Sequence, residues 1–371
     1  MKKFLLCTML LGFAASPLFA LRPGDKALKL DRIRMVRGDA VDPAVVVEKS
    51  QPPALRAVVF LLCRAENAPA TVAMLNDLER SFGGELRTMV VTPDPTPDAE
   101  TLKSVTGAFR VPIGVDVERQ ITKQYMAGSL LYPMAFLVGR DGVILWCGEA
   151  VDLAEKIRPA LDGKLSIDTE AKIAEAVAEL QQLLRDNSEV QMRRVVKRIF
   201  SLEPGNAAAL RIRLFTLENT RRIPEAGQLI SEQLKAAPKL PRLYFTAADF
   251  AARYNASDAE LAQLVAAFDR NITDPATRIR MAWMLLERFP YHPAGLRFAS
   301  GVLRRPLPPE PLPRANAAAA RALLEYRVGD VAKALEYQRE AVRLLNQVGS
   351  EAELASAKQR EAYLRAVLDL K

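Results

Sequence analysis

Thiol chemistry is the first possibility that this sequence raises, because two cysteines remain once an N-terminal leader is set aside. Cys63 follows the apolar run AVVFLL, and Cys147 ends the apolar run VILWC. An even number of cysteines in an oxidising compartment permits one disulfide. A reactive thiol needs exposure and a lowered pKa, but Cys63 precedes the expected helix rather than lying on its N-terminus. Two roles stay open for Cys63: a redox thiol, alone or with Cys147, or a small buried apolar residue.

Other catalytic machinery is scarce. His292 is the only histidine, in the segment FPYHPAG between helical stretches, and we expect it to be a turn residue. A single histidine builds neither a metal site nor a catalytic triad without partners. The sequence also contains no Gly-rich phosphate loop, no H-E-x-x-H motif and no paired-cysteine metal spacing. We therefore expect neither a metal nor another cofactor.

Length and composition indicate a globular protein of two or three domains. The chain has 371 residues, is 50% hydrophobic and carries a formal net charge of +8. Each half is long enough to bury a core of its own. The basic residues are scattered rather than gathered in one tail, and removing Lys2 and Lys3 with the leader reduces the charge to about +6.

Residues 1–20 resemble a secretory signal. Lys2 and Lys3 precede an apolar run from Phe4 to Ala15, and the segment SPLFA then ends at Ala20. The run is too short for a stable transmembrane anchor. Cleavage after Ala20 fits best, cleavage after Ser16 is the alternative, and an uncleaved anchor is the competing interpretation. We expect an exported protein, periplasmic or extracellular.

Residues 21–164 alternate short apolar runs with helical segments, which is typical of an α/β layer. The expected strands are 45–47, 57–62, 86–91, 134–138 and 143–147, and the expected helices are 69–82, 98–106 and 119–126. The runs that begin at 57, 86 and 134 are continuously apolar, which suits a central sheet covered on both faces. Asn67 is a candidate N-cap for the first helix, and the run Gly-Arg-Asp-Gly at 139–142 predicts a hairpin turn.

Residues 165–371 show only helical periodicity, interrupted by prolines. Pro204 and Pro238 are 34 residues apart, with Ala226 twelve residues before the second. This spacing suggests helix pairs repeated at a fixed period. A clearer copy spans 318–345, where small residues fall at the positions that close helix packing would need: Ala322, Gly329, Ala334 and Ala341. The segment 304–314 interrupts the array, and 350–371 is expected to be a capping helix.

Two resemblances follow from these motifs. Residues 23–164 resemble the TlpA- or ResA-like redoxins of thioredoxin-like fold, through the Pro-Gly-Asp entrance at 23–25, the strand-turn-helix ending in LNDL, and LYPMAFLVGRDGVILWCGE. The second half resembles tetratricopeptide repeats, most clearly at 318–345. The expected architecture is therefore a thioredoxin-like α/β domain (21–164) followed by an all-α array of tetratricopeptide type (165–371).

The redoxin resemblance places that family's redox cysteines at Ala65 and Ala68 and its preceding tryptophan at Arg64. Alanine can neither form a thiolate nor resolve a mixed disulfide. The resemblance also implies a cis-proline at Pro133, after Tyr132, bordering a groove in which an extended peptide pairs with the sheet. In that fold two strand spacings, about 9.5 Å, separate the Cys63 and Cys147 strands, so a bridge between them would need distortion.

A basic face is the last candidate site. Arg194, Lys197 and Arg198 share one side of an expected helix. Such a run is usually a solvated helix face, and the alternative is a site for an acidic protein surface or anionic headgroups. Nucleic acid is not expected as a partner of an exported protein. The sequence favours a redox-inactive scaffold that holds a protein or peptide in the helical groove, with a thiol-disulfide oxidoreductase that uses Cys63 as the alternative. A further alternative is that the helices have no binding role and only support the first domain.

Overall fold

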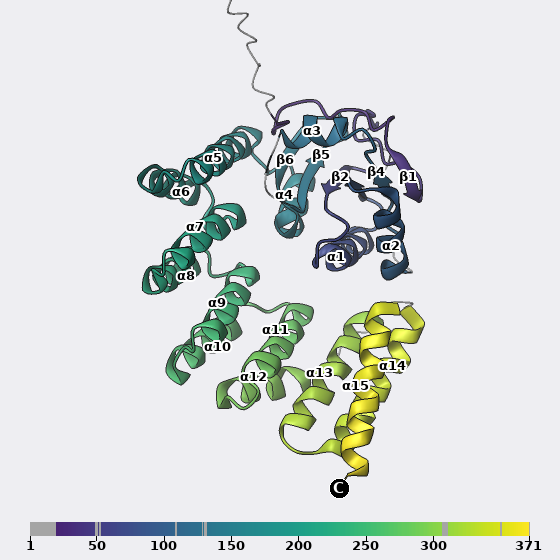
Figure 1. Ribbon diagram of the computed structural model, residues 1–371, viewed down its shortest axis with the longest axis vertical. Helices are drawn as coiled ribbons and strands as arrows, with labels where there is room; N and C mark the ends of the chain where they lie inside the picture. Colours follow the sequence, from purple (N-terminus) through teal and green to yellow (C-terminus); the bar gives the residue numbers. More distant parts are fainter. Residues whose placement is uncertain are drawn as a thin grey trace, which may run out of the picture.

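The computed structural model describes residues 20–48, 51, 53–107, 110–127, 129, 132–305, 311–348 and 351–370. Residues 1–19 of the predicted leader lie outside this part of the chain. The described residues form a mixed sheet with flanking helices, followed by an array of helices that curves beside it (Figure 1). None of the described helices is long and apolar enough to cross a bilayer.

The sheet has six strands in the order β1-β4-β3-β2-β5-β6. The pairs β2–β3 and β3–β4 are parallel, whereas β1–β4, β2–β5 and β5–β6 are antiparallel. The strands are β1 (Arg34–Arg37), β2 (Leu55–Phe60), β3 (Leu86–Thr92), β4 (Ile113–Val115), β5 (Met134–Val138) and β6 (Ile144–Glu149).

Both faces of the sheet are covered, as the continuously apolar strands predict. The helices of this part are α1 (Ala68–Ser81), α2 (Thr96–Thr106), α3 (Gln120–Met126), the short 3-10 helix η1 (Ala150–Asp152) and α4 (Leu153–Leu161). Because side chains alternate along a strand, Ala57 and Val59 of β2 join the core beneath α1, α2 and α4. Val58 and Phe60 join the core on the other face, beneath α3.

The prediction of a strand at 45–47 is wrong, and two strands were missed. Val45 and Val46 are exposed and belong to no strand. The buried guanidinium of Arg56 holds this segment in place: its N–H groups donate to the carbonyls of Asp42 and Val45 and, at 2.7 Å, to the carbonyl of Gly139 in the turn between β5 and β6. The missed strands, β1 and β4, are a half-exposed edge strand and a strand of three residues, which carry little apolar signal.

The other predicted strands and helices of this part occur within a few residues of their predicted bounds, whereas η1 and α4 were not predicted. The peptide bond between Tyr132 and Pro133 is cis, as the resemblance implies. It leads directly into β5, and the expected hairpin turn joins β5 to β6. With this strand order and this cis-proline, the six-stranded sheet and its flanking helices have a thioredoxin-like fold.

The second part of the chain consists of helix pairs stacked side by side. Its helices are α5 (Ile167–Arg185), α6 (Glu189–Leu202), α7 (Ala207–Asn219), α8 (Ile223–Ala236), α9 (Pro241–Arg253), α10 (Asp258–Asn271), α11 (Pro275–Arg288), α12 (Pro293–Leu303), α13 (Pro311–Arg327), α14 (Val331–Val348) and α15 (Glu351–Asp369). Partners within a pair contact each other, as do α5 with α7, α9 with α11 and α11 with α13. The expected helical repeat architecture is present.

The positions of the prolines relative to the helices explain why the spacing between them varies. Pro204 and Pro238 each come two residues after a helix, α6 and α8, whereas Pro275 starts α11, which accounts for the drift in period. Ala322, Ala334 and Ala341 are buried, as expected for a close helix pair. Gly329 was predicted to be small for close helix packing, but its role is different. It lies in the turn between α13 and α14 with φ +90°, a conformation that favours glycine. Of the interrupting segment, residues 306–310 lie outside the described residues.

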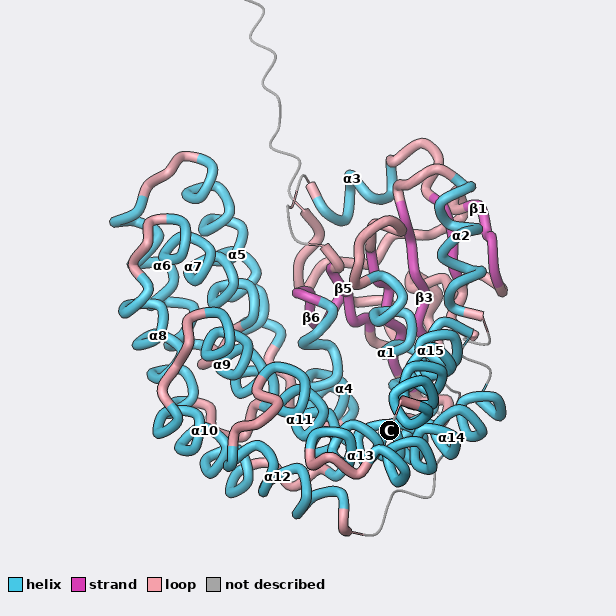
Figure 2. The backbone as a smooth tube through the Cα atoms, turned by 60° about the horizontal axis from the view of Figure 1, so that its bottom comes forward, coloured by secondary structure: helices cyan, strands magenta, loops and turns pink. Residues whose placement is uncertain are grey.

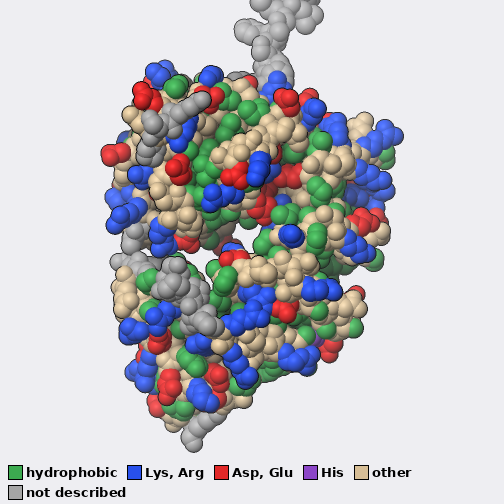
Figure 3. Space-filling view, turned by 180° about the vertical axis from the view of Figure 1, so that it is seen from behind, with side chains coloured by type: hydrophobic (Ala, Val, Ile, Leu, Met, Phe, Trp, Pro, Cys, Tyr) green, Lys and Arg blue, Asp and Glu red, His purple; other side chains and the backbone are tan. Residues whose placement is uncertain are grey.

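The array meets the sheet at both of its ends. The predicted boundary at residue 164 falls between α4 and α5, and α5 packs on β6. At the far end α15 lies against α2 (Figure 2). The space-filling view from behind shows an opening between the sheet part above and the array below, with acidic side chains gathered in a hollow just above it (Figure 3).

Candidate functional site

The turn that replaces the redox pair has the expected backbone but no sulfur. The N–H of Ala68 donates to the carbonyl of Ala65 at 2.9 Å, so these two positions flank a tight turn at the start of α1. Ala68 is buried and Ala65 is half-buried. Asn67 occupies the predicted N-cap position, although its side chain makes no capping hydrogen bond.

Cys63 is buried, with 9% of its surface exposed. Burial, and to a smaller degree the carboxylates of Asp94 and Asp98, raise its pKa to about 11 against an opposing hydrogen bond with Thr92. Its N–H donates to Asp94 Oδ2 at 2.5 Å. An ion pair of 2.8 Å joins Arg64 to Asp98, so this guanidinium is held by a carboxylate nearby. The surroundings of Cys63 therefore favour the neutral thiol, which is a poor nucleophile.

Cys147 is also buried, and the two cysteines are not brought together. Burial raises the pKa of Cys147 to about 12. It lies on β6 opposite Phe136 and belongs to the core on the α3 side of the sheet. Cys63 belongs to the core on the other side, and β5 separates their strands. Both thiols are free, and a disulfide cannot span opposite faces of a sheet without rebuilding it.

The cis-proline lies next to the region where the array joins the sheet. Pro133 immediately precedes β5, and its carbonyl accepts a hydrogen bond of 3.0 Å from the N–H of Ala150. Glu149, the last residue of β6, pairs with Met134. Val151 follows and is 51% exposed. The predicted peptide groove at Tyr132 and Pro133 is thus flanked by the segment that continues from β6 into α4.

Two arginines of the array reach this same segment. Arg211 of α7 lies 3.2 Å from Glu149 Oε1. Arg242, in the first turn of α9, pairs with Asp152 and, at 2.7 Å, with Glu155. These contacts place the sheet-facing sides of α7 and α9 beside the end of the sheet that carries the cis-proline. The cis-proline end of the sheet and the helical array, each predicted separately from the sequence as a binding site, therefore lie next to each other.

A buried lysine also joins the sheet part to the helical array. Lys156 of α4 is 8% exposed and donates to Glu170 of α5 at 2.7 Å. It also lies 2.7 Å from Glu203, which follows α6. Burial would lower the pKa of Lys156, but the two carboxylates outweigh it and raise the pKa. We call the groups that join the two parts the ionic junction: Glu149, Asp152, Glu155, Lys156, Glu170, Glu203, Arg211 and Arg242.

No protein-family model and no curated protein sequence matches this chain. Solved structures resemble its first part at low identity. The Xanthomonas campestris bacterioferritin comigratory protein is 13% identical with a TM-score of 0.30, covering 40% of this chain and 98% of that one. A putative thiol:disulfide interchange protein DsbE from Chlorobium tepidum is 17% identical (TM-score 0.29; 40% and 100% covered). StoA from Bacillus subtilis is 14% identical (TM-score 0.27; 35% and 97% covered). The fold assignment rests on strand order and the cis-proline.

The sheet-facing side of α7 also carries an exposed aromatic residue. Phe215 is one helical turn after Arg211 and therefore on the same side of the helix. It is 55% exposed. Exposed apolar side chains such as Phe215 on α7 and Val151, two residues after the Glu149 that Arg211 binds, are the kind of residue that contacts polypeptide side chains. Spacing alone did not single out Phe215, because α7 is apolar on most of its sides.

The predicted basic face is on α6 and is partly neutralised. Arg194 and Lys197 are exposed, as expected for a solvated face. Arg198 pairs with Glu179 of α5. Arg213 of α7, another cation of this region, is buried and donates to Glu189 at 2.8 Å. With two cations left on the face, little electrostatic attraction for an anionic surface remains.

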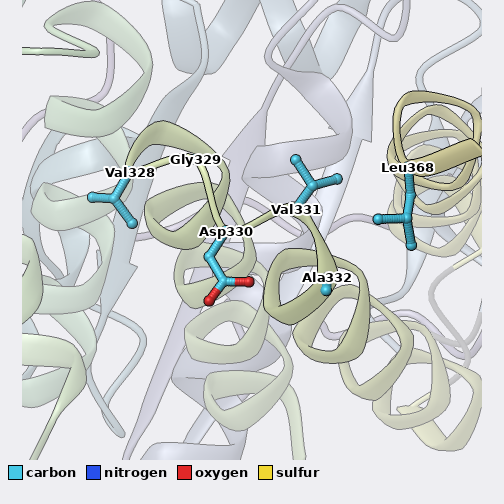
Figure 4. Close-up of a pocket in the computed structure, with 6 residues that line it drawn as sticks. All are labelled: Val328, Gly329, Asp330, Val331, Ala332 and Leu368. Carbon is cyan, nitrogen blue, oxygen red and sulfur yellow. The ribbon is translucent and has the colours of Figure 1, made fainter. Parts of the chain in front are cut away.

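The other candidates are structural. His292 is the N-cap of α12, and its Nδ1 accepts from the N–H of Ala294 at 3.2 Å, in agreement with its predicted turn position. Within the described ranges no cluster of His, Cys, Asp and Glu could hold a metal. A shallow hollow of about 450 Å³ lies at the α13–α14 turn and holds none of the predicted site residues (Figure 4). Its one carboxylate, Asp330, caps α14 and pairs with Lys333.

Proposed function

We propose that this chain is an exported, redox-inactive scaffold that binds an extended segment of another protein. The binding surface is the region where the cis-proline end of the sheet meets the sheet-facing side of the array. We define it by three exposed or half-buried residues, Tyr132, Val151 and Phe215, and call it the junction groove. The partner pairs with the sheet beside Pro133 and packs apolar side chains on Val151 and Phe215.

One observation carries the non-catalytic part of this proposal. The two positions at the start of α1 that would exchange electrons are alanines, and the nearby thiol of Cys63 is buried with a pKa of about 11. At neutral pH such a thiol is almost entirely protonated. Nothing among the described residues favours the alternative, a thiol-disulfide oxidoreductase, because Cys147 lies on the opposite face of the sheet.

The binding part is supported by the contacts that bring the array next to the cis-proline end of the sheet. Arg211 binds Glu149 beside the cis-proline end, and Phe215 follows one turn later on the same helix. A partner chain that pairs with the sheet there would meet α7 within a few residues. The tetratricopeptide-like character of the array belongs to the same proposal, because stacked helix pairs present an extended surface on one side.

Peptides selected from a random library on the full-length protein would test this proposal. We expect Phe215→Asp to weaken the binding of selected peptides at least about tenfold, because a charge would replace the apolar contact. Val190→Asp is the matched control: Val190 is 66% exposed on α6, a helix that contributes no residue to the junction groove. Equal binding by the wild type and Phe215→Asp, or equal losses in both variants, would refute the groove.

A further inference from the structure

The ionic junction contains more carboxylates than cations. The acids are Glu149 on β6, Asp152 on η1, Glu155 on α4, Glu170 on α5 and Glu203 after α6. They face Lys156 on α4, Arg211 on α7 and Arg242 on α9. The buried thiol of Cys147 on β6 also faces Glu170, and its pKa is raised mainly by burial and further by the carboxylates of Glu170 and Asp25. With every group ionised, the junction has a surplus of negative charge in a largely buried place.

The hydrogen bonding of the junction is also incomplete. Glu170 is 6% exposed; its Oε1 accepts from Lys156, but its buried Oε2 has no hydrogen-bond partner. Asp152 is 3% exposed, and its Oδ1 meets Arg242 as an ion pair without hydrogen-bond geometry. A buried carboxylate oxygen without a hydrogen bond is costly when charged, and protonation removes much of that cost.

The opposite end of the array is attached much less firmly. There α15 lies against α2, and no hydrogen bond or ion pair joins the described side chains of these two helices. Val105, on α2, is 41% exposed. The array is therefore held to the sheet part at its first helices by the packing of α5 on β6 and by the ionic junction, whereas its last helix contacts α2 without such ion pairs.

We propose that the ionic junction is a proton-sensitive hinge: protonation of its surplus carboxylates holds the array against the sheet, and their ionisation lets α15 move away from α2. In the second state the opening widens on the side where the attachment is weak. The hinge regulates access to the junction groove and in that respect rests on the proposed function. The movement itself requires no ligand.

The direction of the pH dependence follows from the pKa values. Burial raises the pKa of Glu149, Glu155 and Glu170, and raises that of Asp152 to about 7. We call the state in which the array lies against the sheet the docked state. An acid whose pKa is raised in the docked state stabilises that state below the acid's ordinary pKa. This stabilisation is lost as the pH rises through the raised pKa. Burial would also raise the pKa of Glu203, but Lys156 outweighs it, so Glu203 opposes docking only in stronger acid. Docking should weaken between about pH 5 and pH 8.

Distance measurements between two spin labels would test the hinge on the full chain. One label is attached through Val105→Cys on α2 and the other through Gln359→Cys, an exposed position on α15. Neither position belongs to the ionic junction, and unsubstituted protein controls for labelling of the buried native cysteines. We expect the fraction of molecules with the longer distance to increase at least about threefold from about pH 5.5 to about pH 8.

A second labelled protein assigns the effect to the junction. In Asp152→Asn/Glu170→Gln two of the surplus carboxylates become neutral isosteres, so the change with pH should be lost. Glu218→Gln is the control: Glu218 is on α7 but pairs with Arg253 at 2.8 Å, outside the junction. Identical distances at both pH values, or a change that persists in the double variant, would overturn the hinge. Neither result depends on a bound peptide, so neither bears on the scaffold proposal.

Discussion

The guanidinium of Arg242 on α9 forms an ion pair with the carboxylate of Asp152, just beyond the last strand of the sheet. Asp152 is two residues after Ala150, whose N–H bonds to the carbonyl of the cis-proline. The helical array is therefore attached next to the place where proteins of this fold carry their active site. This position places the array beside the proposed junction groove.

Asp152→Asn should stabilise the protein at high pH and leave its stability unchanged at low pH. Burial raises the pKa of Asp152 to about 7, so its ionisation opposes folding, whereas asparagine cannot ionise. The free energy of unfolding of the variant should match the wild type near pH 4 and exceed it by on the order of 2 kcal/mol near pH 8. Urea unfolding at the two pH values measures this difference. Asp162→Asn, at a more exposed carboxylate, is the control; a constant difference for Asp152→Asn would contradict the assignment.

Lys156→Met should be strongly destabilising. The substitution keeps the apolar part of the side chain but leaves the carboxylates of Glu170 and Glu203 without their cation in a buried place. Removing one partner of a buried ion pair costs about 3–5 kcal/mol. Lys164→Met is the matched control, because Lys164 is 74% exposed and its pair with Asp162 should contribute less than about 1 kcal/mol. Similar losses in the two variants would show that burial of Lys156 does not matter.

Cys63 should react slowly with alkylating reagents in the native protein. Its exposure of 9% and its pKa of about 11 leave about one thiolate per 10,000 molecules at pH 7. The rate should increase about tenfold per pH unit towards pH 11 and should become fast on unfolding. Mass spectrometry of the modified cysteine gives the rate. Rapid native labelling at pH 7, together with insulin reduction that Cys63→Ser abolishes, would restore the oxidoreductase interpretation.

Two glycine substitutions should act in opposite directions. A Cβ on Gly114, in β4, would lie 2.2 Å from Ile33 Cγ2, so Gly114→Ala forces buried atoms apart and should cost about 1–3 kcal/mol. Gly301, in α12, has nothing within 4 Å of the added Cβ. Gly301→Ala should therefore stabilise the protein by up to about 1 kcal/mol through helix propensity. Thermal unfolding of both variants measures the effects, and a neutral Gly114→Ala would contradict the packing of β4 against residue 33.

Local sequence patterns were sufficient for most of the fold. Continuous apolar runs identified β2, β3 and β5, because a strand buried on both faces has no polar side. The helix pair α13–α14 was recognisable from its alanines, which are small enough for close packing. The prediction of a strand at 45–47 was wrong because its valines are apolar but are not paired in the sheet; the carbonyl of Val45 is instead held by Arg56, eleven residues later in the chain.

For the candidate site, too, some features followed from the sequence and others only from the tertiary structure. By itself the sequence determined which atoms are missing: residues 65 and 68 carry no sulfur, whatever the fold. The resemblance to redoxins also located the cis-proline at Pro133, through the motif that surrounds it in the chain. Only the tertiary structure decided that the two cysteines lie on opposite faces of the sheet and that Glu149, Asp152 and Lys156 meet charges from α5, α7 and α9. Ion pairs between residues far apart in sequence have no periodicity, and they become visible only when the chain has brought their elements together.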